Sequence, residues 1–283
     1  MRSSVKSTKS NSNTKKKKAK YLRKKSHQKK KVAESLNKPD KKGKKKSLKK
    51  LSKQKGIRIS GKPEEIYKLL INAITEQNIL KVKTIIKSGK LDDPNKLLDD
   101  SNKTFLHLVI DLNNNNMVNT LLTHPKINPN IVSNSYGSPL YMASMRGYID
   151  IVNILLGYKG MYSINPNIGF YDYDESDNII GNNSPLIIAT ENGRDDIVST
   201  LLDNHADPNI ADSLNNTPLH IAAEGADLVI VKKLITAGAD PSKKNDDDEK
   251  PIDVAKMIGH LGVITYLQSK TIAIRRVYSS KKK

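Results

Sequence analysis

The strongest constraint on the fold is a motif that recurs along the middle of the chain. Aligned copies start at residues 104, 138, 184, 217 and 250, and a degraded copy starts near residue 68. Most copies are followed by a second apolar run at a similar offset, as in "NILLG", "STLLDN" and "KLITAG". A period of roughly 20 to 50 residues indicates a solenoid, in which one unit cannot bury its apolar face alone and is stabilised by stacking on its neighbours.

Each copy carries the signals of a helix start. Ser138, Ser184 and Thr217 have side chains that can accept hydrogen bonds from the free N–H groups of a first helical turn. A proline follows each of them, at the position where a helix needs no N–H donor. Glycines near the end of the first apolar run, such as Gly147 and Gly193, permit a turn into a second helix. The sequence therefore predicts units of two short helices.

The most complete copy resembles an ankyrin repeat. The motif that carries the resemblance is formed by Thr217, Pro218, Leu219, His220, Ile221 and Ala222. It is followed by an apolar run at 229–235 and by a "GADP" turn at 238–241. The resemblance covers about residues 64–268 and implies an all-α ankyrin-repeat solenoid of five to six helix-turn-helix units with projecting turns or short hairpins. The Asn-, Lys- and Ile-rich composition also resembles ankyrin proteins of amoeba-infecting giant viruses.

His220 raises the question of whether this motif does chemistry. The aligned position holds His107 in one other copy, but Tyr141, Ile187 and Asp253 elsewhere. The resemblance implies that the threonine and histidine hydrogen-bond locally and brace the turn, and a position that varies among stacked copies is typical of such bracing. We therefore expect a structural role for the motif residues Thr217, Pro218, Leu219, His220, Ala222 and His107.

One interval is longer than the others, because about 13 residues are inserted between Leu156 and Ser184. Insertions in solenoids map to projecting loops, so residues 157–183 should enlarge one finger. The segment concentrates aromatic and acidic side chains, which suit a contact site for a basic partner. The alternative is a disordered insertion with no role. The candidate contact residues are Tyr158, Tyr162, Phe170, Tyr171, Asp172, Tyr173, Asp174 and Glu175.

Charge divides the chain into three parts. Residues 1–62 hold 26 Lys and Arg against two acids, and residues 270–283 hold six Lys and Arg with no acid. The remaining residues 63–269 hold 17 basic and 27 acidic side chains. So much charge with so few apolar residues cannot offset the entropy of folding, and we expect residues 1–62 to form a disordered basic arm. Residues 63–269 form the predicted repeat domain, and residues 270–283 a short basic tail.

The arm has two candidate roles. Its lysine clusters can neutralise phosphates of nucleic acid without reading sequence, or serve as signals for nuclear import receptors. Binding to an anionic membrane is a third possibility, but the arm has no aromatic or acyl anchor to hold it there. The arm could also bind the acidic fingers of its own chain at 99–100 and 246–249. The lysines concerned are Lys15, Lys16, Lys17, Lys18, Lys41, Lys42, Lys44, Lys45 and Lys46.

Catalytic, metal and membrane motifs give little support to other functions. The chain has no cysteine, and no recognised hydrolase or kinase signature occurs. The stretch 56–63 nearly fits a phosphate-binding loop, but Pro63 replaces the magnesium-binding hydroxyl. The stretch 172–183 begins like a calcium loop, but lacks its glycine and its bidentate glutamate. We expect no cofactor, no metal site, no secretory signal and no transmembrane segment, and an intracellular location in cytoplasm or nucleus, of a host cell if the protein is viral.

The function predicted from the sequence is non-enzymatic binding of an unidentified protein partner by a monomeric scaffold. Two alternatives remain open at this point. The chain could be a nucleic-acid-binding protein whose repeats only solubilise or dimerise it, or an adaptor that recruits host proteins for degradation.

Overall fold

The computed structural model describes residues 59, 61–173 and 179–280, with only the backbone described for 172–173, 179–180 and 271–280. All of these lie in one compact unit, Ile57–Lys283. The described residues form twelve helices, which pair into six helix-turn-helix units. Their bounds are α2 Pro63–Thr75, α3 Ile79–Lys87, α4 Phe105–Asp111, α5 Asn115–Leu122, α6 Pro139–Arg146, α7 Ile149–Leu156, α8 Pro185–Glu191, α9 Asp195–Asp203, α10 Pro218–Glu224, α11 Leu228–Thr236, α12 Pro251–Ile258 and α13 Leu261–Ser280.

The helices start where the sequence predicts. The hydroxyl oxygen of Ser138 accepts from the N–H of Tyr141 at 3.0 Å, and that of Ser184 accepts from the N–H of Ile187 at 3.2 Å. Proline occupies the first turn of α2, α6, α8, α10 and α12. Pro63 begins α2, and Glu64 and Glu65 place negative charge beside the positive end of the helix dipole.

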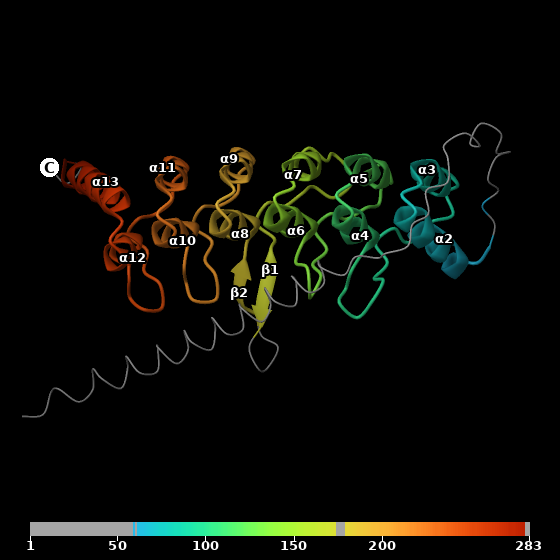
Figure 1. Ribbon diagram of the computed structural model, residues 1–283, viewed down its shortest axis with the longest axis horizontal. Helices are drawn as coiled ribbons and strands as arrows, with labels where there is room; N and C mark the ends of the chain where they lie inside the picture. The colour runs from blue at the N-terminus through green and yellow to red at the C-terminus, as the bar shows by residue number, and fades with distance from the viewer. Residues whose placement is uncertain (1–58, 60, 174–178, 281–283) are drawn as a thin grey trace, which may run out of the picture. The chain divides into compact units, whose positions relative to one another are not determined.

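The units stack side by side into an array with two rows of helices. The first helices of the units form one row and the second helices the other (Figure 1). Apolar side chains from both rows form one continuous core, from Ile66 in α2 to Leu267 in α13. Alanines such as Ala143, Ala189 and Ala222 are almost fully buried, so neighbouring first helices can approach closely. This is the all-α array of stacked helix pairs predicted from the sequence.

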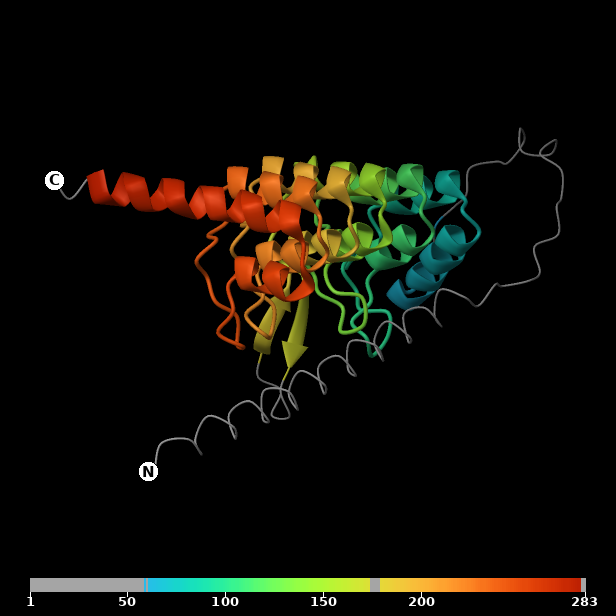
Figure 2. The same ribbon diagram turned by 60° about the vertical axis from the view of Figure 1, so that its left-hand side comes forward.

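Between consecutive units the chain makes a projecting finger. Four fingers are short and are closed by backbone hydrogen bonds within 98–103, 133–137, 212–216 and 245–249. The third finger is longer and contains a β-hairpin of β1 Phe170–Tyr173 and β2 Ile179–Asn183. The strands are antiparallel, with Phe170 opposite Asn183 and an irregularity after Asp172. The hairpin extends past the neighbouring fingers in both views (Figures 1 and 2).

The two ends of the array are built differently. At the first unit, Ile59 joins the core with 7% of its surface exposed, and the ammonium of Lys90 donates to its carbonyl at 2.7 Å. Ile59 lies within the segment assigned to the basic arm by charge. At the last unit, α13 runs for 20 residues and continues beyond the array (Figure 2). In the described part of the chain, no helix is both long enough and apolar enough to cross a bilayer.

Candidate protein-interaction surface

The fingers form a row that is cross-linked by hydrogen bonds. The N–H of Asn134 donates to the carbonyl of Ser101 at 2.8 Å, which joins the first two fingers. The N–H of Asp246 donates to the carbonyl of Leu214 at 3.0 Å, which joins the last two. These neighbouring fingers are therefore held in register with each other.

The histidines of the repeat motif hold the start of a helix and the next finger together. Nδ1 of His107 accepts from the N–H of Thr104 at 3.2 Å, and its Nε2 donates to the carbonyl of Gly137 at 2.9 Å. His220 does the same with the N–H of Thr217 at 3.1 Å and the carbonyl of Glu249 at 3.0 Å. Each ring thus contacts the start of its own helix and also bridges to the following unit, and the sequence did not predict the second contact.

Both imidazoles are neutral in this setting. Burial lowers the pKa of His107 to about 4, and the hydrogen bond to Gly137 offsets only part of that effect. Burial also lowers the pKa of His220. Because Nδ1 accepts from a backbone N–H, a proton there would place two donors face to face. The rings are 0% and 1% exposed, so a substrate could not reach them.

The hairpin is anchored at its base by the fingers on either side. The rings of Phe170 and Tyr141 lie 6.0 Å apart, and a Cβ added to Gly137 would meet both side chains. On the other side, a Cβ added to Gly181 would lie 2.4 Å from the backbone nitrogen of Ser213. The base of the hairpin is therefore tightly packed between its neighbours.

The structure separates the aromatic residues that the sequence grouped as a contact site. Tyr162 is 42% exposed, and the adjacent Met161 is 67% exposed. Tyr158, Phe170 and Tyr171 are half-buried. The hydroxyl of Tyr158 donates to the carbonyl of Ile127 at 3.2 Å. The backbone of the remaining candidates Asp172 and Tyr173 lies in β1, whereas Asp174 and Glu175 lie outside the described residues.

A ladder of asparagines, which the sequence analysis missed, runs along the array. Each of the first five units ends in an Asx-Pro-Asn or Asx-Pro-Ser turn, at 93–95, 128–130, 165–167, 207–209 and 240–242. In each of the first four, the Asn side-chain oxygen accepts from a backbone N–H of the next turn. The distances are 2.7 Å for Asn95 to Asn128, 2.9 Å for Asn130 to Asn165, 2.8 Å for Asn167 to Asp207 and 2.8 Å for Asn209 to Asp240.

The ladder shows where the inserted residues lie, and it ends at the turn of 240–242, before the sixth unit. Asn209 precedes Thr217 by eight positions, whereas Asn167 precedes Ser184 by seventeen, so nine added residues lie in the hairpin. The remaining inserted residues come before Asn165, in the loop where Met161 and Tyr162 are exposed. In the last turn the hydroxyl of Ser242 donates to Asp240 of its own turn at 2.7 Å. Stacking is therefore continuous across the insertion.

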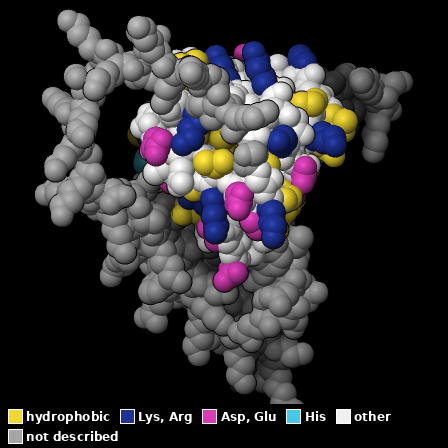
Figure 3. Space-filling view, turned by 90° about the vertical axis from the view of Figure 1, so that its right-hand side faces the viewer, with side chains coloured by type: hydrophobic (Ala, Val, Ile, Leu, Met, Phe, Trp, Pro, Cys, Tyr) yellow, Lys and Arg dark blue, Asp and Glu magenta, His cyan; other side chains and the backbone are white. Residues whose placement is uncertain are grey.

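The outer surface of the described residues has mixed charge. Figure 3 shows the end of the array near α2 and α3, where basic, acidic and apolar side chains are interspersed. The lysines predicted to contact nucleic acid or import receptors, Lys15–Lys18 and the cluster at 41–46, lie outside the described residues. Among the described residues, no group of three His, Asp or Glu side chains is placed to hold a metal ion.

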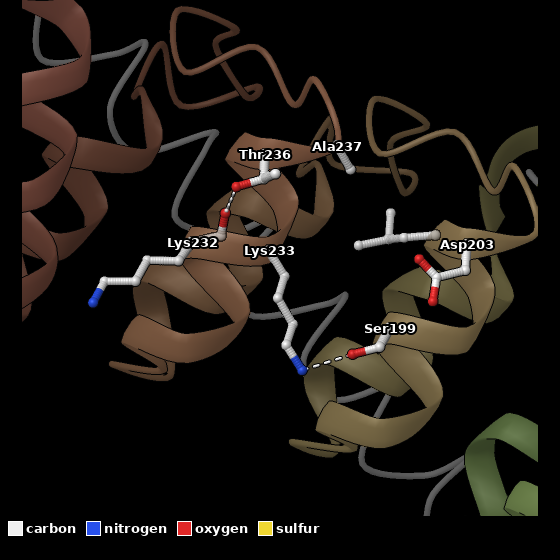
Figure 4. Close-up of a pocket in the computed structure, with 7 residues that line it drawn as sticks. Ser199, Asp203, Lys232, Lys233, Thr236 and Ala237 are labelled. Carbon is white, nitrogen blue, oxygen red and sulfur yellow. Dashed lines mark hydrogen bonds between the residues drawn. The ribbon is translucent and has the colours of Figure 1, made fainter.

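A shallow groove lies between the second helices α9 and α11. It is lined by Leu202, Asp203 and Thr236 among others, and the ammonium of Lys233 donates to the hydroxyl of Ser199 at 2.6 Å across it (Figure 4). Lys233 also pairs with Asp195 at 2.5 Å. These contacts tie two neighbouring units together, which is a structural role.

Comparisons with known proteins agree with this architecture. The family described as ankyrin repeats matches three times, at residues 69–169, 164–245 and 186–277. Solved structures also match, 506 chains in all. One is the crystal structure of EF0377, an ankyrin repeat protein, with 22% identity and a TM-score of 0.58 over 71% of this chain and 96% of that one. No curated protein matches the sequence.

At 22% identity the structural likeness shows only the fold. The family matches, however, cover well over half of the chain and overlap all six helix pairs. The chain therefore belongs to the ankyrin-repeat family.

Proposed function

We propose that this protein is a non-enzymatic scaffold that binds a protein partner through its fingers and first helices. Ankyrin repeats typically mediate protein–protein interaction, and the matched family is usually non-enzymatic. The observation that carries the proposal is the insertion, which adds a projecting hairpin and an exposed apolar pair, Met161 and Tyr162, to an otherwise regular array. Large apolar side chains held on a packed scaffold are the usual anchors of an interface.

The basic arm supplies a second, weaker contact in this proposal. Its 26 Lys and Arg support binding to nucleic-acid phosphates or to a nuclear import receptor, inside the cell. The Asn-, Lys- and Ile-rich composition supports a source in an amoeba-infecting giant virus, in which case the partner is a host protein. In this proposal the repeats determine which protein is bound, and the arm determines where in the cell the chain is found.

Affinity capture with the full chain as bait tests the scaffold proposal. Nuclease treatment should leave the partner bound, and glutamine substitutions in the lysine clusters at 15–18 and 41–46 should leave it bound as well. Replacing Met161 and Tyr162 by serine should weaken capture about tenfold, because two exposed anchors of an interface are lost. The matched control is Leu80→Ser on α3, which removes a side chain of similar exposure, 68%, away from the fingers.

The opposite pattern would favour a nucleic-acid-binding protein. Capture would then depend on the lysine clusters, disappear after nuclease treatment and fall steeply with salt concentration. The Met161 and Tyr162 substitutions would have no effect.

A further inference from the structure

The repeat domain has only two arginines, and the fold brings them to one turn. Arg146 ends α6, and Arg194 is the residue before α9. Gly147 follows Arg146 with a φ of 75°, a left-handed conformation. A Cβ at Gly147 would lie 2.8 Å from Cζ of Arg194, so the guanidinium of Arg194 rests directly on this glycine. Both arginines therefore flank the turn between α6 and α7.

Arg146 is fixed in place and incompletely satisfied. Its side chain is 6% exposed, and its Nη2 donates to Oδ1 of Asp111 on α4. Its Nε is buried and has no hydrogen-bond partner. The same carboxylate lies 3.5 Å from the ammonium of Lys103, which is 13% exposed. The carboxylate of Asp111 therefore pairs with two cations that are both nearly buried.

Arg194 is exposed, and its side chain makes no hydrogen bond or salt bridge with another described residue. The acids next to it in the sequence and in α7 are engaged elsewhere. Asp195 pairs with Lys233 at 2.5 Å, and Asp150 accepts from the amide of Asn115 at 3.1 Å. Lys103 and Arg146 share the carboxylate of Asp111, and Arg194 adds a third cation beside Gly147, so cations gather at this turn.

We infer that this turn binds an oxyanion of the protein partner, either an Asp or Glu carboxylate or a phosphorylated side chain. Guanidinium groups match these planar or tetrahedral oxyanions with paired N–H donors, and a partly buried guanidinium binds them more strongly than one in free solvent. The inference rests on the proposed function, since it names chemistry that the partner must carry.

The charge of the domain favours a protein oxyanion over nucleic acid. Residues 63–269 hold 27 acids against 17 bases, so a polyphosphate chain would be repelled by most of the surface. A single acidic side chain experiences mainly the local field of the turn. The turn therefore fits a binding site for one oxyanion better than an extended basic surface for a polyanion.

Solution NMR of the full chain can test this inference at the level of single residues. The probes are three peptides of the same sequence with Glu, phosphoserine or Gln at one position. The Nε–H signals of Arg146 and Arg194, assigned with Arg146→Lys and Arg194→Lys, should shift with the Glu or the phosphoserine peptide and not with the Gln peptide. The two acidic peptides distinguish carboxylate from phosphate.

The readout separates this site from the basic arm, which also attracts acidic peptides. Shifts confined to Arg2, Arg23, Arg58, Arg275 and Arg276 would overturn the inference. The inference would also be overturned if a DNA duplex shifted the signals of Arg146 and Arg194 and neither acidic peptide did.

A matched pair of variants provides the quantitative check. Arg194→Gln should weaken acidic-peptide binding, followed at the Arg146 signal, by about three- to tenfold, the range for one well-formed charged contact. Lys159→Gln removes the same charge from an exposed loop outside the turn and should change it little. Equal losses in the two variants would indicate only general electrostatics. If Arg194→Gln leaves peptide binding intact while partner capture persists, the scaffold proposal stands and this inference fails.

Discussion

The second and fifth units differ from the third and fourth in how each connects to the next finger. In the second and fifth units, His107 and His220 reach a carbonyl of the following finger through Nε2. In the third unit the hydroxyl of Ser138 makes the bridge, donating to the carbonyl of Ile168 at 2.5 Å. In the fourth unit Ile187 is fully buried at the histidine position, and Ser184 caps its own helix.

The difference shows that the start of a first helix can be joined to the next finger either by a polar hydrogen bond or by apolar packing. The histidine units depend on a neutral, buried ring, so their stability depends on pH. The third and fourth units, which lack the histidine, adjoin the long hairpin, where Phe170 and Tyr141 add apolar contact. The finger that projects farthest is thus anchored by contacts that do not titrate near neutral pH.

The largest expected effect comes from removing a histidine bridge. His107→Ala should lower the free energy of unfolding by about 3 kcal/mol, because it leaves the buried N–H of Thr104 without its partner, removes the bridge to the carbonyl of Gly137 and opens a cavity. Ile187→Ala at the aligned position should cost a similar amount through the cavity alone. Chemical denaturation measures both. The two should differ in pH dependence, which only the histidine confers.

A slightly smaller effect should follow from pH. The pKa of His107 is lowered from 6.5 to about 4, so below pH 6.5 the unfolded chain binds a proton that the folded chain does not. The free energy of unfolding should therefore fall as pH decreases, by about 2 kcal/mol from this residue between pH 7 and pH 5. His220 acts in the same direction. A pH slope unchanged in His107→Ala would contradict the comparison.

The asparagine ladder spans both kinds of unit, so its loss should cost the same in each. Asn130→Ala and Asn209→Ala should each lower the free energy of unfolding by about 1 to 2 kcal/mol, since each removes a bridge between units. Asn204→Ala is the control, because its amide bonds only within its own helix region. Unequal costs at Asn130 and Asn209 would show that the insertion weakens the stacking.

The smallest effect should come from removing a helix cap that makes no hydrogen bond to the next unit. Ser184→Ala removes one helix cap and should cost about 1 kcal/mol. Ser138→Ala removes a cap and a bridge to the next unit, so it should cost more. A thermal denaturation series of the two variants compares them, and equal shifts would mean that the bridge of Ser138 contributes nothing.

The sequence predicted the array well because helix starts are local signals. Ser138, Pro139 and their counterparts define each unit without knowledge of its neighbours, and the period then implies stacking. The ladder escaped notice because an Asx-Pro-Asn turn looks like any loop until the next turn is placed beside it. The same holds for Arg194, whose guanidinium reaches the glycine after Arg146 only because two units stack.

The aromatic residues of the insertion lie in different surroundings, which their sequence does not reveal. Composition identified the insertion, but Phe170 and Tyr158 are half-buried at its base, whereas the exposed Met161 was not selected. Aromatic residues serve both as anchors for a partner and as packing for a hairpin. Their spacing in sequence does not distinguish these uses.

Hydrogen–deuterium exchange of the full chain, free and bound to its captured partner, tests the central claim most directly. The account predicts slower exchange in the fingers and in the loop at 157–168, with the second helices α5, α9 and α11 unchanged. Protection confined to residues 1–62, with the repeats exchanging as in the free chain, would contradict it.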